Sequence, residues 1–281
     1  MSTPWAALHK LWLRCCSAAQ GRTAAPTIPE ALWQQTLLDY PFLQQLSNRE
    51  CQQLRLLCSV FLQRKQFTGA QGLEITDAMA VAIAAQACVL LLAWGAPHHA
   101  LRWYDDFVGI VVYPQDMQVR RTIQDAAGVV HHVELSLQGE AMERGPIALS
   151  WSAVQHPSSV SAGAHLGNVV IHEFAHKLDM ANGQVDGCPP LPAGFMGLSQ
   201  AVQAQALWKR CWAQAYADFV DACLAHERFG QAAPWLDPYA ATDPAEFFAV
   251  ACEAYWLEPG AFAQALPTLH PLLDALFQRQ S

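Results

Sequence analysis

A run of seventeen residues, 78–94, constrains the fold more than any other segment, because Gln86 is its only polar side chain. A helix of this composition lies either in a membrane or at the centre of a globular core. Membrane helices need about 20 apolar residues and usually carry Lys or Arg anchors at their ends, whereas this run is shorter and lacks such anchors. We therefore expect a buried central helix that begins at Thr76 or Asp77 and ends at Gly95.

The composition of the chain agrees with a large core around that helix. Of its 281 residues, 53% are hydrophobic and only 14% are charged, as in compact globular proteins. The net charge of -8 argues against a broad basic face. Nucleic acid is therefore not expected as a direct partner, because binding to a phosphate backbone needs a surplus of Lys and Arg.

The cysteines and the N-terminal segment both indicate the cellular compartment in which the protein is expected. The nine cysteines are odd in number and irregularly spaced, and none of them forms a CxxC pair. This pattern argues against a secreted disulfide framework and against a cysteine-based zinc ribbon. Near the N-terminus, His9, Lys10 and Arg14 interrupt the apolar stretch that a signal peptide would need. We expect a cytoplasmic protein with reduced thiols.

The hydrophobic periodicity changes twice along the chain. Up to Gly95 apolar residues recur at helix spacing, and Ser47 with Glu50 is typical of a capping box at a helix start. A middle part then has the pattern of short strands, and the last part returns to helix. The expected strands are 107–113, 129–137 and 147–151, and the expected later helices are 167–181, about 198–227, 243–257 and 268–279. Strands clustered between helices predict an α+β fold.

These segments are expected to form one domain. Residues 1–27 read as a weakly structured lead-in, and residues 28–281 as a single unit. Within that unit, 28–106 is the helical N-terminal part and 107–281 is the core that carries the candidate site. No internal repeat or low-complexity tract divides the chain.

The segment 167–180 contains an H-E-x-x-H motif formed by His172, Glu173 and His176. Residues at i and i+4 lie one turn apart on the same helix face, so both imidazoles can bind one divalent ion such as zinc. The carboxylate of Glu173 then lies near a metal-activated water and can act as a general base. Apolar neighbours on both sides favour this interpretation over a chance occurrence on an exposed helix. The charge of Lys177 suggests that its own edge of the helix faces solvent.

A third protein ligand must come from outside the motif. The H-x-x-G-x-x-H continuation of metzincins is absent, because Asp179 and Asn182 occupy its glycine and last histidine positions. Asp179 lies on the same helix face as the two histidines. We expect it to accept a hydrogen bond from a histidine N–H rather than to bind metal directly.

Two glutamates on a later helix compete for the third ligand position. Asp243 followed by Pro244 is typical of a helix start. Glu246 then lies in the first turn, where it could also serve only as a capping-box partner, and Glu253 lies two turns further along. Spacing alone leaves both candidates open, with a slight preference for Glu246.

Several ordered blocks of the chain resemble the Mlc titration factor A family of bacterial zinc metallopeptidases. The blocks are FLQRKQF, QGLEIT, FVGIVVYP, GPIALSW, VVIHEFAHKLDMANG and DPYAATDPAEFFAVACEAYW. Together they cover about residues 28–271, and the first 27 residues are unlike the usual start of the family. Such a series of blocks is much more specific than an H-E-x-x-H motif alone.

The resemblance implies a zincin-like fold, related in its core to the catalytic domain of anthrax lethal factor. It implies one zinc ion per chain, bound by His172, His176 and Glu246. It further implies that Glu173 is the catalytic base and that Tyr239 donates a hydrogen bond to the tetrahedral intermediate. The implied activity is that of a cytoplasmic, aminopeptidase-type hydrolase of peptides that also binds the glucose-responsive transcriptional repressor Mlc, although no residues here can be assigned to that binding.

A substrate strand can also be suggested from the sequence. Zincins usually add the peptide to an edge strand of the sheet through main-chain hydrogen bonds. The run 147–151 follows a Gly145-Pro146 turn and precedes the metal-binding helix. We expect this run to be the edge strand, with Ile147 and Leu149 contacting substrate, and an interior strand is the alternative.

The residues leave three functions open. The leading one is a zinc peptidase, and a second is a regulatory protein that sequesters a transcription factor and whose metal site is secondary. A third is a metal-dependent hydrolase of a non-peptide substrate. Glu173 favours an enzyme, because a binding module has no need of a base beside the metal.

Overall fold

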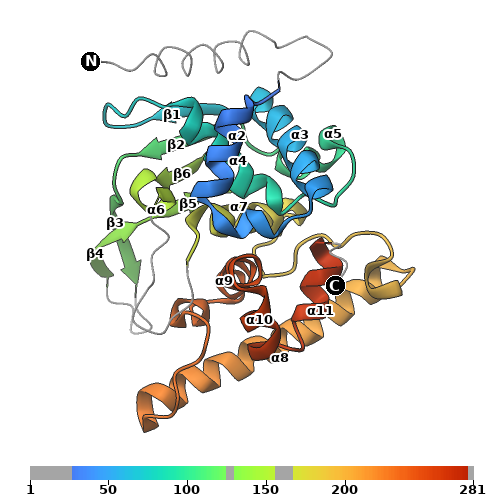
Figure 1. Cartoon of the computed structure of the whole chain (residues 1–281). Helices are drawn as coiled ribbons and strands as arrows, with labels where there is room; N and C mark the ends of the chain where they lie inside the picture. The colour runs from blue at the N-terminus through green and yellow to red at the C-terminus, as the bar shows by residue number, and fades with distance from the viewer. Residues whose placement is uncertain (1–26, 125–129, 156–166, 278–281) are drawn as a thin grey trace.

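The structure, a computed structural model, describes residues 27–124, 130–155 and 167–277, so the expected lead-in lies outside it except for Thr27 (Figure 1). The α-helices are α2 (Glu30–Asp39), α3 (Asn48–Arg64), α4 (Asp77–Val89), α5 (Pro97–Ala100), α6 (Trp151–Gln155), α7 (Val169–Asp179), α8 (Ala201–Phe229), α9 (Pro244–Leu257), α10 (Pro259–Ala265) and α11 (His270–Phe277). The strands are β1 (Gln66–Gly69), β2 (Gly109–Tyr113), β3 (Met117–Gln124), β4 (Val130–Leu137), β5 (Gly139–Ala141) and β6 (Ile147–Ser150). This mixture of helices with a small sheet is compatible with the expected α+β class.

The apolar run forms the central helix α4, although the helix is shorter than expected. The Thr76 side chain accepts a hydrogen bond from the Met79 N–H at its start, and the helix ends at Val89. Every residue from Met79 to Val89 is buried, Gln86 included, because α2, α3 and α7 all pack against this helix. Among the described residues, no helix is both long and apolar enough to cross a membrane.

A four-stranded sheet has the strand order β1-β2-β6-β5. The strands β1, β2 and β6 are parallel, and β5 pairs antiparallel with β6. β6 is therefore an interior strand, and its residues Ile147 and Leu149 are completely buried. The expectation that 147–151 forms the edge of the sheet is wrong, because β5 covers that side and forms the edge itself.

Two further strands differ from the sequence-based expectation. β1 lies inside the region expected to be helical, and its four residues are too few to show a strand periodicity. The strand expected at 129–137 does not join the main sheet. Among the described residues, β4 pairs with β3 alone, in a two-stranded ribbon in which Met117 lies opposite Leu137.

Helices α8 to α11 form a layer on the far side of α7 from the N-terminal helices (Figure 1). Trp208 and Trp212 of α8 are stacked, with ring centroids 4.7 Å apart. Both rings also contact Phe248 of α9, with centroid distances of 6.1 Å and 5.6 Å. Since α9 packs along α7 as well, this aromatic cluster fixes the position of α9 relative to the helix that carries the H-E-x-x-H motif.

Candidate metal centre

Helix α7 carries both motif histidines at a single point in the interior. Asn168 caps the helix, since its Oδ1 atom accepts a hydrogen bond of 2.9 Å from the Ile171 N–H. Most of the other side chains of this helix are apolar and buried, with the charged groups of Glu173, Lys177 and Asp179 buried among them. The Nε2 atoms of His172 and His176 consequently lie 3.2 Å apart, because residues one turn apart share a helix face.

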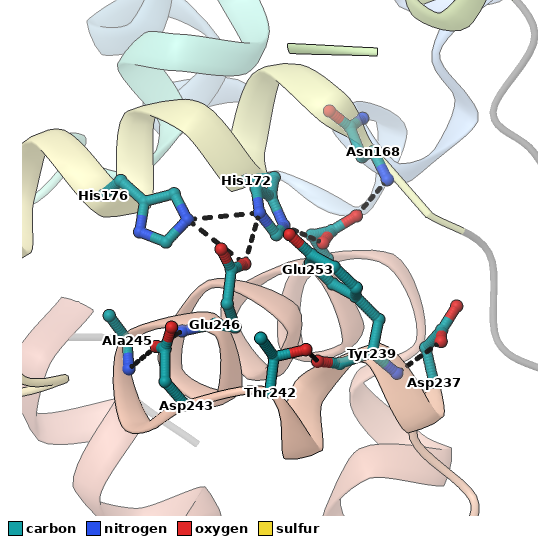
Figure 2. A network of polar contacts seen from close by, with 10 residues as sticks. All are labelled: Asn168, His172, His176, Asp237, Tyr239, Thr242, Asp243, Ala245, Glu246 and Glu253. Carbon is teal, nitrogen blue, oxygen red and sulfur yellow. Dashed lines mark hydrogen bonds and ion pairs between the residues drawn. The ribbon is translucent and has the colours of Figure 1, made fainter. Parts of the chain in front are cut away.

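Helix α9 brings Glu246 to the same point. The Asp243 carboxylate accepts hydrogen bonds from the N–H groups of Ala245 and Glu246, and Pro244 occupies the first helical position, as predicted. Glu246 Oε2 lies 3.0 Å from His172 Nε2 and 3.4 Å from His176 Nε2. Figure 2 shows this carboxylate facing both rings from the opposite helix.

These three atoms have the spacing of a metal donor set. In a tetrahedral zinc site with bonds of about 2.0–2.1 Å, neighbouring ligand atoms are about 3.3 Å apart. The three separations here are 3.2, 3.0 and 3.4 Å. Two imidazoles with one carboxylate are typical of catalytic zinc sites, in which a fourth position is left for water or substrate. His172, His176 and Glu246 could thus hold a metal ion.

Glu253, the competing candidate, lies on the other side of the His172 ring. Its Oε1 atom is 2.7 Å from His172 Nδ1, and its Oε2 atom accepts a hydrogen bond from the Asn168 backbone N–H. Both contacts are visible in Figure 2. Glu253 therefore orients the ring that carries a donor atom, instead of supplying a donor itself.

The charges of the donor groups depend on one another. Burial alone would lower the pKa of His172, but hydrogen bonds to Glu246 and Glu253 hold that pKa well above its usual range. Burial alone would raise the pKa of Glu246, whereas the close imidazoles of His172 and His176 bring it far below its usual value. Glu246 is consequently ionised at neutral pH, as a carboxylate ligand must be.

Glu173 lies beside the donor set and against strand β5. Its side chain is almost completely buried and borders a cavity. Burial raises the pKa of this carboxyl group, although the charges of His172 and His176 act in the opposite direction, as does a hydrogen bond from the Ala141 backbone N–H. A carboxylate whose pKa is raised toward neutrality is suited to accept and return a proton.

Tyr239 approaches the donor set from the segment before α9. It lies in the short 3-10 helix η5 (Pro238–Ala241), where Asp237 accepts a hydrogen bond from its backbone N–H. Its ring centroid is 6.2 Å from that of His172. Burial raises the pKa of the phenol, and the neighbouring carboxylate of Glu246 raises it further. The phenol is therefore a neutral hydrogen-bond donor at this site.

The carboxyl group of Asp179 is buried at the end of α7. Its Oδ2 atom accepts a hydrogen bond of 2.9 Å from the Gly187 N–H. Its Oδ1 atom and His176 Nδ1 are both buried without a hydrogen-bond partner among the described residues. The expected hydrogen bond between Asp179 and a histidine remains a prediction.

Lys177 does not face solvent, and that expectation is wrong. Its side chain is completely buried. The Nζ atom contacts Asp106 Oδ2 at 2.8 Å and donates to the carbonyl groups of Met142 and Gly145 at 2.6 Å and 3.0 Å. Lys177 thus ties the metal-binding helix to the turn between β5 and β6.

A cavity of about 460 Å³ opens beside the donor set. Its lining includes His172, Glu173, Tyr239, Glu253, Asn168, Gly139, Gln138 and Leu137. The predicted substrate residues of β6 are absent from this lining. Sequence reasoning overlooked Gly139 and Asn168, although each gives a local signal: a glycine within a strand often marks a close approach of another group, and an asparagine directly before a helix is typical of an N-cap.

Comparison with known proteins shows the family of this chain. The chain matches the family model described as glucose-regulated metallo-peptidase M90 over residues 15–278. It is similar to the Mlc titration factor A of Klebsiella pneumoniae (strain 342), with 33% identity over 85% of this chain and 83% of the relative. It is also similar to that of Serratia proteamaculans (strain 568), with 34% identity over 89% and 87% of the two chains. The chain belongs to the M90 family of glucose-regulated metallopeptidases.

Proposed function

We propose that this protein is a zinc-dependent peptidase of aminopeptidase type, with a zincin-like core at 107–281 inside a single domain at 28–281, and that it acts in the cytoplasm. The observation that carries the proposal is the triangle of His172 Nε2, His176 Nε2 and Glu246 Oε2, with separations of 3.0–3.4 Å, beside the buried carboxylate of Glu173. That combination would hold a metal ion and a general base at one point.

Each residue of the site has a role in the proposed reaction. Zinc held by His172, His176 and Glu246 would polarise a peptide carbonyl and lower the pKa of water to about 7. Glu173 accepts a proton from the attacking water, whose oxygen bonds to the carbonyl carbon. The same carboxyl group then gives the proton to the amine nitrogen as the C–N bond breaks.

Tyr239 lines the same cavity as Glu173 and supports the same step. A neutral phenol donates a hydrogen bond to the negative charge that develops on the carbonyl oxygen. Its raised pKa keeps the proton on the phenol. Because Tyr239 is half exposed, we expect it to adjust its position when substrate enters the cavity.

Strand β5, instead of β6, is the proposed substrate strand. It forms the edge of the sheet next to α7, and Gly139 borders the cavity. The peptide would extend the sheet by main-chain hydrogen bonds to this edge. This arrangement, in which the edge strand passes the helix that carries the metal ligands, is the support for a zincin-like core.

The names of the relatives support a second role. Those proteins are called Mlc titration factor A, which suggests that this chain also binds a sugar-responsive transcriptional repressor of the Mlc type. We expect binding of a repressor to be independent of Glu173, because a binding surface needs no general base. The two roles can therefore be separated by changing that residue alone.

The decisive experiment compares wild type with Glu173→Gln for zinc content, hydrolysis of alanine p-nitroanilide and binding to a purified Mlc-type repressor. We expect equal zinc in both proteins and a loss of activity of at least about 10²-fold in the variant, as for removal of a general base. Glu143→Gln, on the exposed β5–β6 turn, is the matched control and should remain active. Equal activity of wild type and Glu173→Gln would refute the proposed peptidase mechanism.

A blocked substrate tests the aminopeptidase assignment separately. An aminopeptidase recognises the free amine, so acetylation of the substrate nitrogen should abolish hydrolysis. If the acetylated peptide is cleaved equally well, the enzyme is not an aminopeptidase, although the peptidase mechanism stands. If the repressor binds Glu173→Gln and wild type equally while neither shows hydrolysis, the regulatory alternative is favoured.

A further inference from the structure

Strand β5 passes the carboxylate of Glu173 at a distance that only glycine permits. A Cβ atom placed on Gly139 would lie 2.4 Å from Glu173 Oε1, 2.6 Å from Glu173 Cγ and 2.7 Å from Val169 Cγ2. These distances are far below the optimum of about 3.5–4.0 Å between non-bonded carbon atoms. The space that a side chain at position 139 would need is therefore filled by the side chains of Glu173 and Val169.

The pairing of β5 directs a backbone donor to the same carboxylate. On either side of β5, the Ser150 N–H donates to the Gln138 carbonyl and the Met142 N–H donates to the Pro146 carbonyl. In an antiparallel pair every second residue hydrogen-bonds to the neighbouring strand, so positions 138, 140 and 142 face β6 with their backbone groups. Gly139 and Ala141 are the alternate residues, paired by register with Leu149 and Ile147. Their N–H groups therefore point away from β6, and that of Ala141 donates to Glu173.

We propose that Gly139 and Ala141 together form a seat that positions the catalytic base, with Gly139 supplying the space and Ala141 the hydrogen bond. The inference rests on the proposed function, since it concerns the base of that reaction. Neither residue belongs to the group that could hold the metal ion. Gly139 is thus a positioning residue: because it has no side chain, it leaves the space in which the Glu173 carboxylate lies.

The overlap between a new side chain at position 139 and Glu173 is removed most easily by a movement of the Glu173 carboxylate, because that group is the flexible end of its side chain. The variant Gly139→Ala should therefore keep its zinc and its fold while kcat falls. A misplacement of about 1 Å in a catalytic group can cost about 10²-fold in rate, and we expect a loss of about that size. Gly109→Ala is the matched control, because its added Cβ would meet only Pro146 Cβ at an ordinary 3.4 Å.

A double-mutant cycle shows whether Gly139 acts through Glu173. In the Glu173→Gln background, where no base remains, Gly139→Ala should reduce the residual rate by less than about 3-fold, because residues that act as a unit are not additive. An equal loss of rate in both backgrounds would mean that Gly139 acts by another route, and would overturn the proposal.

Hydrogen exchange of the Ala141 amide gives a readout that does not depend on activity. In chelator-treated full-length protein, Glu173→Ala removes the acceptor of this N–H and should accelerate its exchange. Gly139→Ala should accelerate the same amide by displacing the acceptor, and Gly109→Ala should leave it unchanged. If the Ala141 amide of Gly139→Ala exchanges at the same rate as in wild type, and kcat is also unchanged, the proposal is overturned.

Two further outcomes are informative. If Gly139→Ala loses cooperative thermal unfolding, the double variant Gly139→Ala/Glu173→Ala should regain it, because the clashing atoms of Glu173 are gone. A double variant that also fails to fold would show that the remaining contact with Val169 Cγ2 dominates, and would overturn the proposal. If Glu173→Gln is fully active the proposed function fails, whereas an inactive Glu173→Gln with a fully active Gly139→Ala refutes only the seat.

Discussion

His172 Nδ1 and Glu253 Oε1 lie 2.7 Å apart and join α7 to α9. A histidine that binds a metal ion is neutral, with one N–H and one acceptor nitrogen, so in a metal-bound form this contact would keep the proton on Nδ1 and leave the Nε2 lone pair for the ion. Glu253 itself is buried and is held by the Asn168 backbone N–H. The tautomer of one donor is thus set by a carboxylate on the opposite helix.

Replacing the two glutamates of α9 should have different effects on zinc binding. Glu246→Gln removes a donor atom and should abolish stoichiometric zinc after dialysis. Glu253→Gln removes only the orienting contact and should weaken zinc binding by about 10–100-fold, as for other partners of metal-binding histidines. Competition with a chromophoric chelator measures both affinities. Glu227→Gln, exposed on α8, is the control, and a larger loss in Glu253→Gln than in Glu246→Gln would contradict these roles.

The polar network behind His172 reaches the central helix. Gln86 Oε1 accepts a hydrogen bond of 2.7 Å from Asn168 Nδ2, and both side chains are buried. Gln86→Leu would leave that amide group without its acceptor, so the free energy of unfolding should fall by about 1–3 kcal/mol. Urea denaturation of the chelator-treated protein measures this change. Gln203→Leu, exposed on α8, should stay within about 0.5 kcal/mol of wild type, and a wild-type midpoint for Gln86→Leu would contradict the prediction.

Lys177 and Lys209 each pair with an aspartate but should differ in energetic importance. Lys177 is completely buried against Asp106, whereas the pair of Lys209 with Asp186 is exposed. Lys177→Met leaves two carbonyl groups without their donor, whereas Asp106 is partly exposed and can be hydrated, so the variant should lose about 1–3 kcal/mol of stability. Lys209→Met should cost at most about 1 kcal/mol. Thermal unfolding of both variants tests the contrast, and equal melting temperatures would refute it.

Local features of the site could be predicted from sequence. The one-turn spacing of His172 and His176 determines that both rings share a face, and the order Asp243-Pro244 predicts the start of α9. The capping box of Ser47 with Glu50 is present as well. Each of these depends only on residues within about one helical turn of each other.

Features that depend on distant segments could not be predicted. Glu246 and Glu253 are seven residues apart on one helix face, and only the crossing of α9 over α7 decides which of them meets the Nε2 atoms. The strand order of the sheet is likewise non-local. The residues of β6 read as an edge strand because the three-residue strand β5 that covers it is too short to leave a pattern.

Asp179 should make the stability of the metal-free protein depend on pH. Burial raises the pKa of this carboxyl group from 3.8 to about 6, so between these values the native state retains a proton that the unfolded chain has released. The free energy of unfolding contributed by this group therefore falls as pH rises from about 4 to 6. The whole penalty, at most about 3 kcal/mol for a shift of this size, is present above pH 6.

Asp179→Asn removes that penalty, because the amide does not ionise and can still accept the hydrogen bond from the Gly187 N–H. Its melting temperature should match wild type near pH 4 and exceed it increasingly up to pH 7. Calorimetry of the chelator-treated proteins between pH 4 and 8 measures the difference. Asp221→Asn, exposed on α8, should follow wild type throughout. A constant difference between Asp179→Asn and wild type would show that burial of the charge is not the cause.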